Sequence, residues 1–213
     1  MGVPVLILGE SGSGKSYSIK NLDPETTGIM MVEKNTLPFR KPFKNVCRNA
    51  KYPQIYGALK AHNLKCYVID DSQYLMANEY FDRADEVGYQ KFTDIGVHFR
   101  DLIHLVNSKT PDDVIVYFLH HTEMDVNTGK TKAKTIGRML DEKLTLEGTF
   151  NIVLRTVKEN GEYFFRTQSD GNDTVKSPED MFPEKIPNDL ALVDKTIRDY
   201  YGLNAVNKES EEN

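Results

Sequence analysis

The side chains best suited to chemistry form a short run near the start of the chain. Its spacing is G-x-x-x-x-G-K-S, a pattern that binds nucleotide phosphates. Glycines leave backbone N–H groups open to phosphate oxygens, the lysine can reach the terminal phosphates, and the serine hydroxyl can bind Mg²⁺. We therefore expect ATP and Mg²⁺ to be bound by Gly9, Glu10, Ser11, Gly12, Ser13, Gly14, Lys15, Ser16 and the adjoining Tyr17.

The residues around this run predict a strand, a loop and a helix. Residues 3–8 are apolar, as in a strand buried inside a parallel sheet. Residues 15–22 can form a helix, which Asp23 and Pro24 would end. The positive end of the helix dipole would then point at the phosphates. This context favours a phosphate-binding loop over an ordinary glycine-rich turn.

A second candidate element is the run 65–72, an apolar strand that ends in acidic residues. We expect the carboxylate of Asp70 beside the phosphate-binding loop, where it would hold Mg²⁺ together with Ser16. Asp71 would polarise water or cap the helix that follows. The sequence thus predicts a metal site shared by two segments that are far apart in the chain.

Two adjacent histidines follow the fully apolar run 114–119, a strand that we expect in the middle of the sheet. The carboxyl ends of parallel strands border the ligand crevice, so His120 or His121 would sense the terminal phosphate. Neighbouring residues on a strand point to opposite faces, which makes the pair a poor zinc site.

Two stretches of the chain are rich in positive charge and lack acidic residues. Residues 34–51 carry six lysines and arginines, and residues 127–138 carry four. The second stretch has the composition of a mobile loop that could follow a phosphate backbone, although a solvated loop would have the same composition. The candidate DNA contacts are Lys130, Lys132, Lys134 and Arg138.

The composition favours a single globular domain. The chain has 213 residues, of which 39% are hydrophobic and 28% charged. We expect the domain to span residues 1–206, with a disordered polar tail at 207–213. The net charge of −5 argues against a wholly basic nucleic-acid-binding protein. Two cysteines without metal spacing and the lack of a long apolar run predict reduced thiols and a cytoplasmic protein.

The rest of the chain predicts further helices and a hairpin. Asn160 and Gly161 stand between two apolar runs, which indicates a hairpin of strands 150–157 and 163–167. Asn188 is expected to cap the last helix, and Gly202 to end it. Helices are also expected at 54–62, 73–87, 91–108 and 139–147, with a strand at 28–32 and a loop at 168–182.

Taken together, these features resemble RecA-like P-loop ATPases, and in particular small phage-encoded ATP-binding proteins of single-strand annealing and recombination. The resemblance rests on the phosphate-binding loop, the strand ending in Asp70 and the closing residues 188–201. It implies an α/β fold with a mainly parallel central sheet flanked by helices, a β-hairpin and a C-terminal helix. It also implies a location in the cytoplasm of a host bacterium.

The resemblance implies roles for individual residues as well. Glu33 would act as the general base on the attacking water, and one of the two histidines would couple the terminal phosphate to the DNA-binding loop. Arg166 would reach the nucleotide of a neighbouring copy, with Arg155 and Lys176 as alternatives. Self-association into a ring or a filament is therefore expected.

The function that follows is ATP hydrolysis coupled to single-stranded DNA binding in phage recombination, annealing or replication. One alternative is a nucleotide or nucleoside kinase, although such kinases usually carry an arginine-rich lid and Arg138 stands alone in its loop. Another is a nucleotide-dependent loader or assembly module, with a single-strand-binding protein or a helicase as its partner. The catalytic set of the favoured function is Glu33, Lys15, Asp71, His120, His121 and Arg166.

Overall fold

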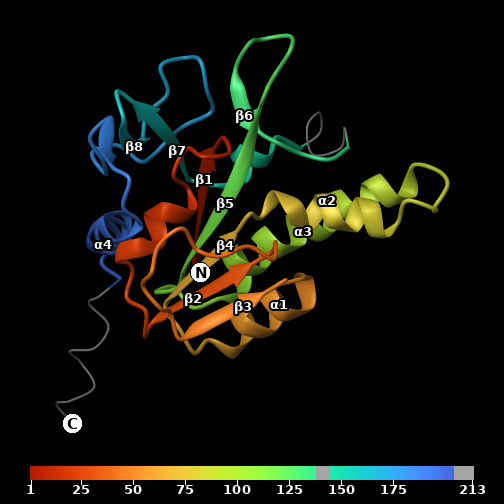
Figure 1. Ribbon diagram of the computed structural model, residues 1–213, viewed down its shortest axis with the longest axis horizontal. Coiled ribbons are helices and arrows are strands. Elements are labelled where there is room, and N and C mark those ends of the chain that lie inside the picture. The colour runs from red at the N-terminus through yellow and green to blue at the C-terminus, as the bar shows by residue number, and fades with distance from the viewer. Residues whose placement is uncertain (138–143, 204–213) are drawn as a thin grey trace.

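A computed structural model describes residues 1–137 and 144–203 of the chain. It is a mixed α/β structure in which a mostly parallel sheet lies between two layers of helices (Figure 1). Arg138, most of the helix expected at 139–147 and the tail at 207–213 lie outside the described residues. Within the described part of the chain, no helix has the length and apolar character needed to cross a membrane.

Six strands of the described sheet run parallel to one another. They are β1 (Val3–Gly9), β2 (Thr27–Met31), β3 (Asn45–Arg48), β4 (Cys66–Asp70), β5 (Ile115–Met124) and β7 (Ile152–Glu159). Three further strands are antiparallel to their neighbours. β6 (Thr131–Ala133) pairs with β5, β8 (Glu162–Arg166) pairs with β7, and β9 (Lys185–Pro187) pairs with β8. The order across the sheet is β3-β2-β4-β5-β1-β7-β8-β9, so β5 lies in the middle, as its apolar sequence predicts.

Helices cover both faces of this sheet. One layer holds α1 (Tyr52–Ala61), α2 (Gln73–Asp82) and α3 (Gln90–Lys109), and the other holds the 3₁₀ helix η1 (Ser16–Asn21) and α4 (Leu190–Tyr201). On β1, Leu6 and Leu8 pack into the first layer, whereas Val5 and Ile7 pack into the second. A strand buried on both faces must be apolar at every position, which explains the sequence before the phosphate-binding loop.

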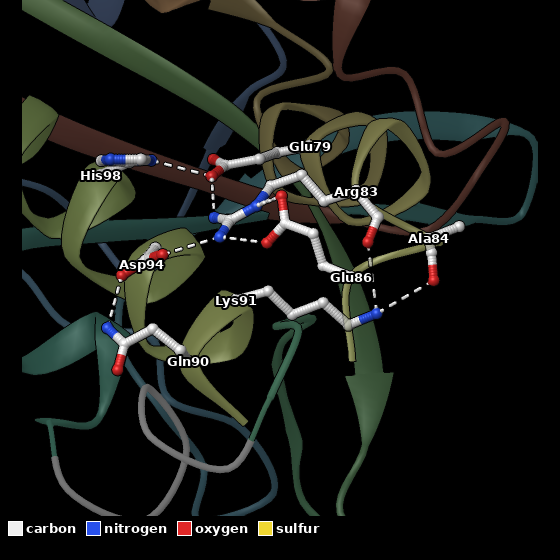
Figure 2. Close-up of polar contacts among 8 residues, drawn as sticks. All are labelled: Glu79, Arg83, Ala84, Glu86, Gln90, Lys91, Asp94 and His98. Atoms are coloured by element: carbon white, nitrogen blue, oxygen red, sulfur yellow. Dashed lines mark hydrogen bonds and ion pairs between the residues drawn. The ribbon is translucent and has the colours of Figure 1, made fainter. Parts of the chain in front are cut away.

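A network of charged side chains joins α2 to α3 (Figure 2). Arg83, just past the end of α2, lies 3.2 Å from Glu79 and 2.7 Å from Asp94. The buried Lys91 donates its Nζ to the backbone carbonyls of Arg83 and Ala84, at 3.3 and 3.4 Å. A cation at the carboxyl end of a helix stabilises its dipole. The network therefore holds the two helices together as a pair that projects from the sheet (Figure 1).

The expected hairpin is present between β7 and β8. Its two turn residues, Asn160 and Gly161, have φ angles of 52° and 86°. Positive φ at both positions matches the right-handed twist of the flanking strands, which is why Asn-Gly is favoured there. Gly202 also ends α4 as expected, with a φ of 66° in the left-handed region.

The N-cap of α4 is a correction to the sequence prediction. Asp189, rather than Asn188, caps this helix, and its Oδ1 accepts a hydrogen bond of 2.9 Å from the backbone N–H of Ala191. The sequence offers both residues as caps because each carries a short side-chain oxygen acceptor. Asn188 is used elsewhere, as described below.

The segment after the phosphate-binding loop is also different from the prediction. The helix expected at residues 15–22 is the six-residue 3₁₀ helix η1. The Ser18 hydroxyl donates to the carbonyl oxygen of Lys15, and such local bonds compete with helix propagation. Leu22 then leaves helical geometry with ψ at 152°, just before Asp23 and Pro24.

Several further element boundaries were wrong in the sequence prediction. The strands β3, β6 and β9 fall in stretches where no strand was expected, because three or four partly polar residues give no clear alternating pattern. β5 continues five residues past Leu119 to Met124. α2 ends at Asp82 and not at Val87.

Candidate functional site

A cavity of about 860 Å³ lies at the carboxyl ends of β1 and β4, beside His121 of β5. This is the edge of an open parallel sheet where ligands commonly bind. The structure brings together here most of the residues singled out from the sequence, which reach this point from four separate segments. Those that line the cavity are Ser11, Gly12, Gly14, Lys15, Ser16, Tyr17, Glu33, Asp70, Asp71 and His121.

The glycine-rich loop turns tightly between β1 and η1, and Gly14 is a constrained position in it. Its φ of 98° is one that residues with a side chain rarely adopt. A Cβ there would lie 2.7 Å from Nδ2 of Asn188 and 2.9 Å from the ring of Tyr163. Nδ2 of Asn188 also donates a hydrogen bond of 2.9 Å to the carbonyl oxygen of Gly14. The C-terminal part of the chain therefore packs directly on the loop.

Lys15 is buried within the loop, with 5% of its surface exposed. Its Nζ donates hydrogen bonds of 2.9 Å to the carbonyl oxygens of Gly9 and Glu10. Burial lowers the pKa of Lys15, while the carboxylates of Asp71 and Asp70 act in the opposite direction. The arrangement keeps a cation at the floor of the cavity, close to the backbone that would surround a phosphate.

Ser16 and Asp70 meet across the sheet. The Ser16 hydroxyl donates a hydrogen bond of 2.9 Å to Oδ1 of Asp70, although β5 separates the strand before Ser16 from the strand that ends in Asp70. Burial and the neighbouring Asp71 raise the pKa of Asp70 to about 6, against the opposing effects of Ser16 and Lys15. A hydroxyl and a carboxylate oxygen are ligands that Mg²⁺ accepts, with phosphate and water oxygens completing its shell. The donor set therefore fits Mg²⁺.

Asp71 and His121 form a pair inside the cavity. Nε2 of His121 donates to Oδ1 of Asp71 at 3.2 Å, and Asn35 donates to the other carboxylate oxygen at 3.4 Å. Burial would raise the pKa of Asp71, but the hydrogen bond from His121 and the charge of Lys15 keep it below its ordinary value. Asp71 does not cap α2, whose N-cap is Ser72.

Glu33 follows β2 and lines the same cavity. Its Oε1 accepts a hydrogen bond of 2.9 Å from Nδ2 of Asn78, which lies on α2. One carboxylate oxygen is thus held by the helix layer. This contact fixes the direction of the Glu33 side chain relative to the ends of β1 and β4.

His120 lies outside the cavity lining, unlike its neighbour His121. It is fully buried, with Nε2 2.8 Å from the carbonyl oxygen of Lys134 and Nδ1 2.9 Å from the hydroxyl of Ser72. Because a carbonyl can only accept, Nε2 carries the hydrogen in the neutral ring. Burial lowers the pKa of His120 to about 4. The two histidines point to opposite sides of β5, so only His121 meets the cavity.

The candidate trans cations lie away from this cavity. Arg166 on β8 binds Asp170 at 2.5 Å and lies 3.9 Å from the buried carboxylate of Asp173, and Arg155 on β7 is 3.3 Å from the same carboxylate. Lys176 pairs through its backbone with β7. In the single chain, both arginines are thus held by acidic residues of the same chain.

The lysine-rich stretch is in part a hairpin, where the sequence predicts a loop. β5 continues beyond the sheet and turns back as β6 (Figure 1). Lys132 on β6 lies 3.4 Å from Asp125, whereas Lys130 and Lys134 are exposed. The backbone N–H of Ala133 donates a hydrogen bond of 2.7 Å to the buried carboxylate of Glu147. Arg138, the fourth candidate DNA contact, lies outside the described residues.

Sequence reasoning missed several residues that line the cavity or hold its loop and its Glu33 carboxylate in place. Asn78 and Asn188 lie in helical or capping contexts, where nothing in the local pattern indicates that they reach another segment. Tyr163 falls on the expected hairpin, but the hairpin signal does not say which loop the strand covers. Also missed were the lining residues Asn35, Thr36, Pro38 and Tyr74.

No protein-family model matches the chain, and no curated protein matches it.

Proposed function

We propose that this protein binds ATP with Mg²⁺ in the cavity at the ends of β1 and β4, beside His121 of β5, and hydrolyses it. We further propose that the nucleotide state controls the binding of single-stranded DNA. The observation that carries the proposal is the 2.9 Å hydrogen bond between Ser16 and Asp70. It joins the two candidate metal ligands beside a buried lysine and a glycine-rich loop, a combination suited to phosphoryl chemistry.

In the proposed reaction, Lys15 would transfer its hydrogen bonds from the carbonyls of Gly9 and Glu10 to phosphate oxygens. Ser16 and Asp70 would hold Mg²⁺, which when bound neutralises phosphate charge. Glu33 would accept the proton of the attacking water through the oxygen that Asn78 does not occupy. Tyr163, exposed beside Gly14, offers a ring for contact with the base.

Coupling to DNA would run along β5. His121 lies on this strand at the cavity, and the same strand continues into the hairpin that carries Lys130, Lys132 and Lys134. Nε2 of His120 donates a hydrogen bond of 2.8 Å to the carbonyl oxygen of Lys134, the residue that follows β6. A shift of β5 on nucleotide binding would therefore move the hairpin, whose lysines would contact the phosphate backbone.

A neighbouring copy would complete the site. Arg166 would have to exchange its contact with Asp170 for the phosphates of a neighbour's nucleotide. Self-association into a ring or a filament is therefore part of the proposal, and hydrolysis should be slow in the isolated monomer.

The test is ATP hydrolysis with and without a single-stranded oligonucleotide, together with retention of that oligonucleotide at low salt. We expect slow turnover that the oligonucleotide stimulates, and retention that depends on a non-hydrolysable ATP analogue. Equal rates with no retention would contradict the DNA part of the proposal. Phosphoryl transfer to a nucleoside from a panel of nucleosides would instead favour a kinase.

A further inference from the structure

A second cavity, of about 370 Å³, lies beside the first. It opens where β2 and β3 end, since Val32 and Asn49 both line it, and α1 and α2 form its other walls. It is therefore on the same edge of the sheet as the proposed ATP site, where ligands of parallel sheets bind. The proposed hydrolysis reaction does not use this cavity.

Aromatic rings make up much of the second cavity. Tyr52 and Tyr56, one turn apart on α1, are stacked with ring centroids 6.1 Å apart and planes inclined by 27°. The imidazole of His98 meets Tyr52 edge-on, with centroids 5.9 Å apart. Rings of this kind bind flat aromatic groups by stacking, and stacking on a nucleic-acid base depends little on which base it is.

Two polar atoms of the lining residues are buried without a hydrogen-bond partner among residues 1–137 and 144–203: the Tyr52 hydroxyl and Oε2 of Glu79. The other oxygen of Glu79 is used, because it accepts from Arg83 at 3.2 Å and lies 2.9 Å from Nδ1 of His98 (Figure 2). A buried polar group without a partner is unfavourable. The hydroxyl can donate and the carboxylate can accept, so each has a hydrogen bond left to make with a polar group that enters the cavity.

One lysine, Lys51, lines the second cavity, together with the carboxylates of Glu79 and Asp82. Lys51 closes the basic stretch 34–51. Its Nζ lies 3.1 Å from Asp82, with both side chains more than half exposed. Exposed pairs of this kind contribute little to stability, so Lys51 can exchange Asp82 for a phosphate at small cost.

We propose that the second cavity receives one base of single-stranded DNA, and that a phosphate beside this base binds Lys51. The base stacks against Tyr52 and Tyr56, and its polar edge meets the Tyr52 hydroxyl and Glu79. Asn78 lines this cavity and holds Glu33 of the first, so an inserted base acts on the hydrolytic site through one side chain. The inference rests on the proposed function and names the surface through which DNA acts.

The test is photocrosslinking of the full chain, with a non-hydrolysable ATP analogue, to oligodeoxynucleotides that carry 5-iodouracil at a single position. Peptide mapping by mass spectrometry should locate the crosslink at Tyr52 or Tyr56. Tyr52→Leu should weaken oligonucleotide binding by roughly tenfold, and Tyr52→Phe, which keeps the ring, by less. Tyr89→Leu is the matched control, because Tyr89 is 89% exposed between α2 and α3.

Thermal melting and ATP-analogue binding of each variant check that it is folded, and the wild-type crosslink does not depend on any variant. Crosslinks confined to the β5–β6 hairpin would overturn the inference, as would Tyr52→Leu binding the oligonucleotide as tightly as Tyr89→Leu. The inference would also be overturned if a lysine or arginine side chain of another protein chain filled the cavity. If the oligonucleotide still stimulates hydrolysis in these cases, the proposed function survives. A crosslink at Tyr52 without ATP hydrolysis would leave the inference standing and remove the ATPase.

Discussion

Nε2 of His121, within β5, lies 3.2 Å from Oδ1 of Asp71, which follows the neighbouring strand β4. Nε2 of His121 donates to the Asp71 carboxylate, and the ring of Tyr74 packs edge-on against the imidazole with centroids 5.6 Å apart. The pair connects the strand that ends in the candidate metal ligand to the strand that continues into the lysine-bearing hairpin. In the proposed function, a change at the bound phosphates would therefore reach β5 through this pair.

We predict that His121→Gln retains ATP-analogue binding but loses most of the DNA stimulation of hydrolysis, because glutamine cannot reproduce the imidazole contact with Asp71 and Tyr74. The measurement is the ratio of hydrolysis rates with and without oligonucleotide. His104→Gln, an exposed histidine on α3, is the matched control. An unchanged ratio in His121→Gln would show that β5 is not coupled through this pair.

Substitutions at Lys15 and Glu33 should separate ATP binding from ATP hydrolysis. Lys15→Met removes the buried ammonium group from the loop, and we expect loss of nucleotide binding by at least tenfold. Glu33→Gln keeps the shape of the side chain and should bind ATP normally while hydrolysing it at least a hundredfold more slowly. Equilibrium binding of a fluorescent ATP analogue and single-turnover hydrolysis report the two steps. Lys109→Met, exposed at the end of α3, should change neither.

Gly14→Ala and Gly57→Ala should have opposite effects. At Gly14 an added methyl group meets Asn188 and Tyr163 and adopts an unfavourable φ of 98°, so a loss of about 1–3 kcal/mol in stability and weaker nucleotide binding are expected. At Gly57, inside α1, nothing lies within 4 Å, and alanine should stabilise the fold by about 0.4–1 kcal/mol. Urea unfolding measures both changes. A stable, ATP-binding Gly14→Ala would show that the packing on this loop is looser than the structure indicates.

His120 should make the fold sensitive to acid. Burial lowers its pKa from 6.5 to about 4, and the nearby His121 and Lys15 act in the same direction, against the carbonyl of Lys134. Below pH 6.5 the unfolded chain therefore binds a proton at His120 that the folded chain does not bind, so the contribution of His120 to stability falls as pH falls from 6.5 towards 4. The cost at pH 5 is about 2 kcal/mol relative to pH 7.5.

The measurement is urea unfolding at pH 7.5 and pH 5 for the wild type and for His120→Gln. The glutamine variant should be less stable at pH 7.5, since it loses a buried ring, but the pH-dependent loss should shrink by about 2 kcal/mol. The same slope in both proteins would mean that another group controls the acid response.

The parts of the fold that could be predicted are those encoded in one continuous segment. Residues 3–8 are apolar on both faces, and the loop that follows has glycines where the backbone must turn. The hairpin at Asn160 and Gly161 is likewise a local signal. The run ending in Asp70 could be predicted because its apolar residues and the acids that follow them are contiguous in the chain.

The parts that could not be predicted depend on contacts between distant segments. Asn188 binds Gly14 across 174 residues, and its own neighbourhood suggests only a helix cap. The choice between His120 and His121 requires knowing which side of β5 faces the cavity, and alternation along a strand does not settle this. The hydrogen bond from Asn78 to Glu33 joins a helix to a strand end, so no spacing in the sequence reveals it.

Asn78 is the residue at which the two cavities meet, and we expect its replacement to uncouple them. Asn78→Leu keeps a similar volume but removes the hydrogen bond to Glu33, so an inserted base would no longer act on the hydrolytic carboxylate. The DNA-stimulated rate should fall towards the unstimulated rate, while oligonucleotide affinity should stay within about threefold of the wild type. Asn78→Asp, which would place a second carboxylate beside Glu33, should be at least as defective. Asn78→Leu that keeps full stimulation would show that DNA acts on Glu33 by another route.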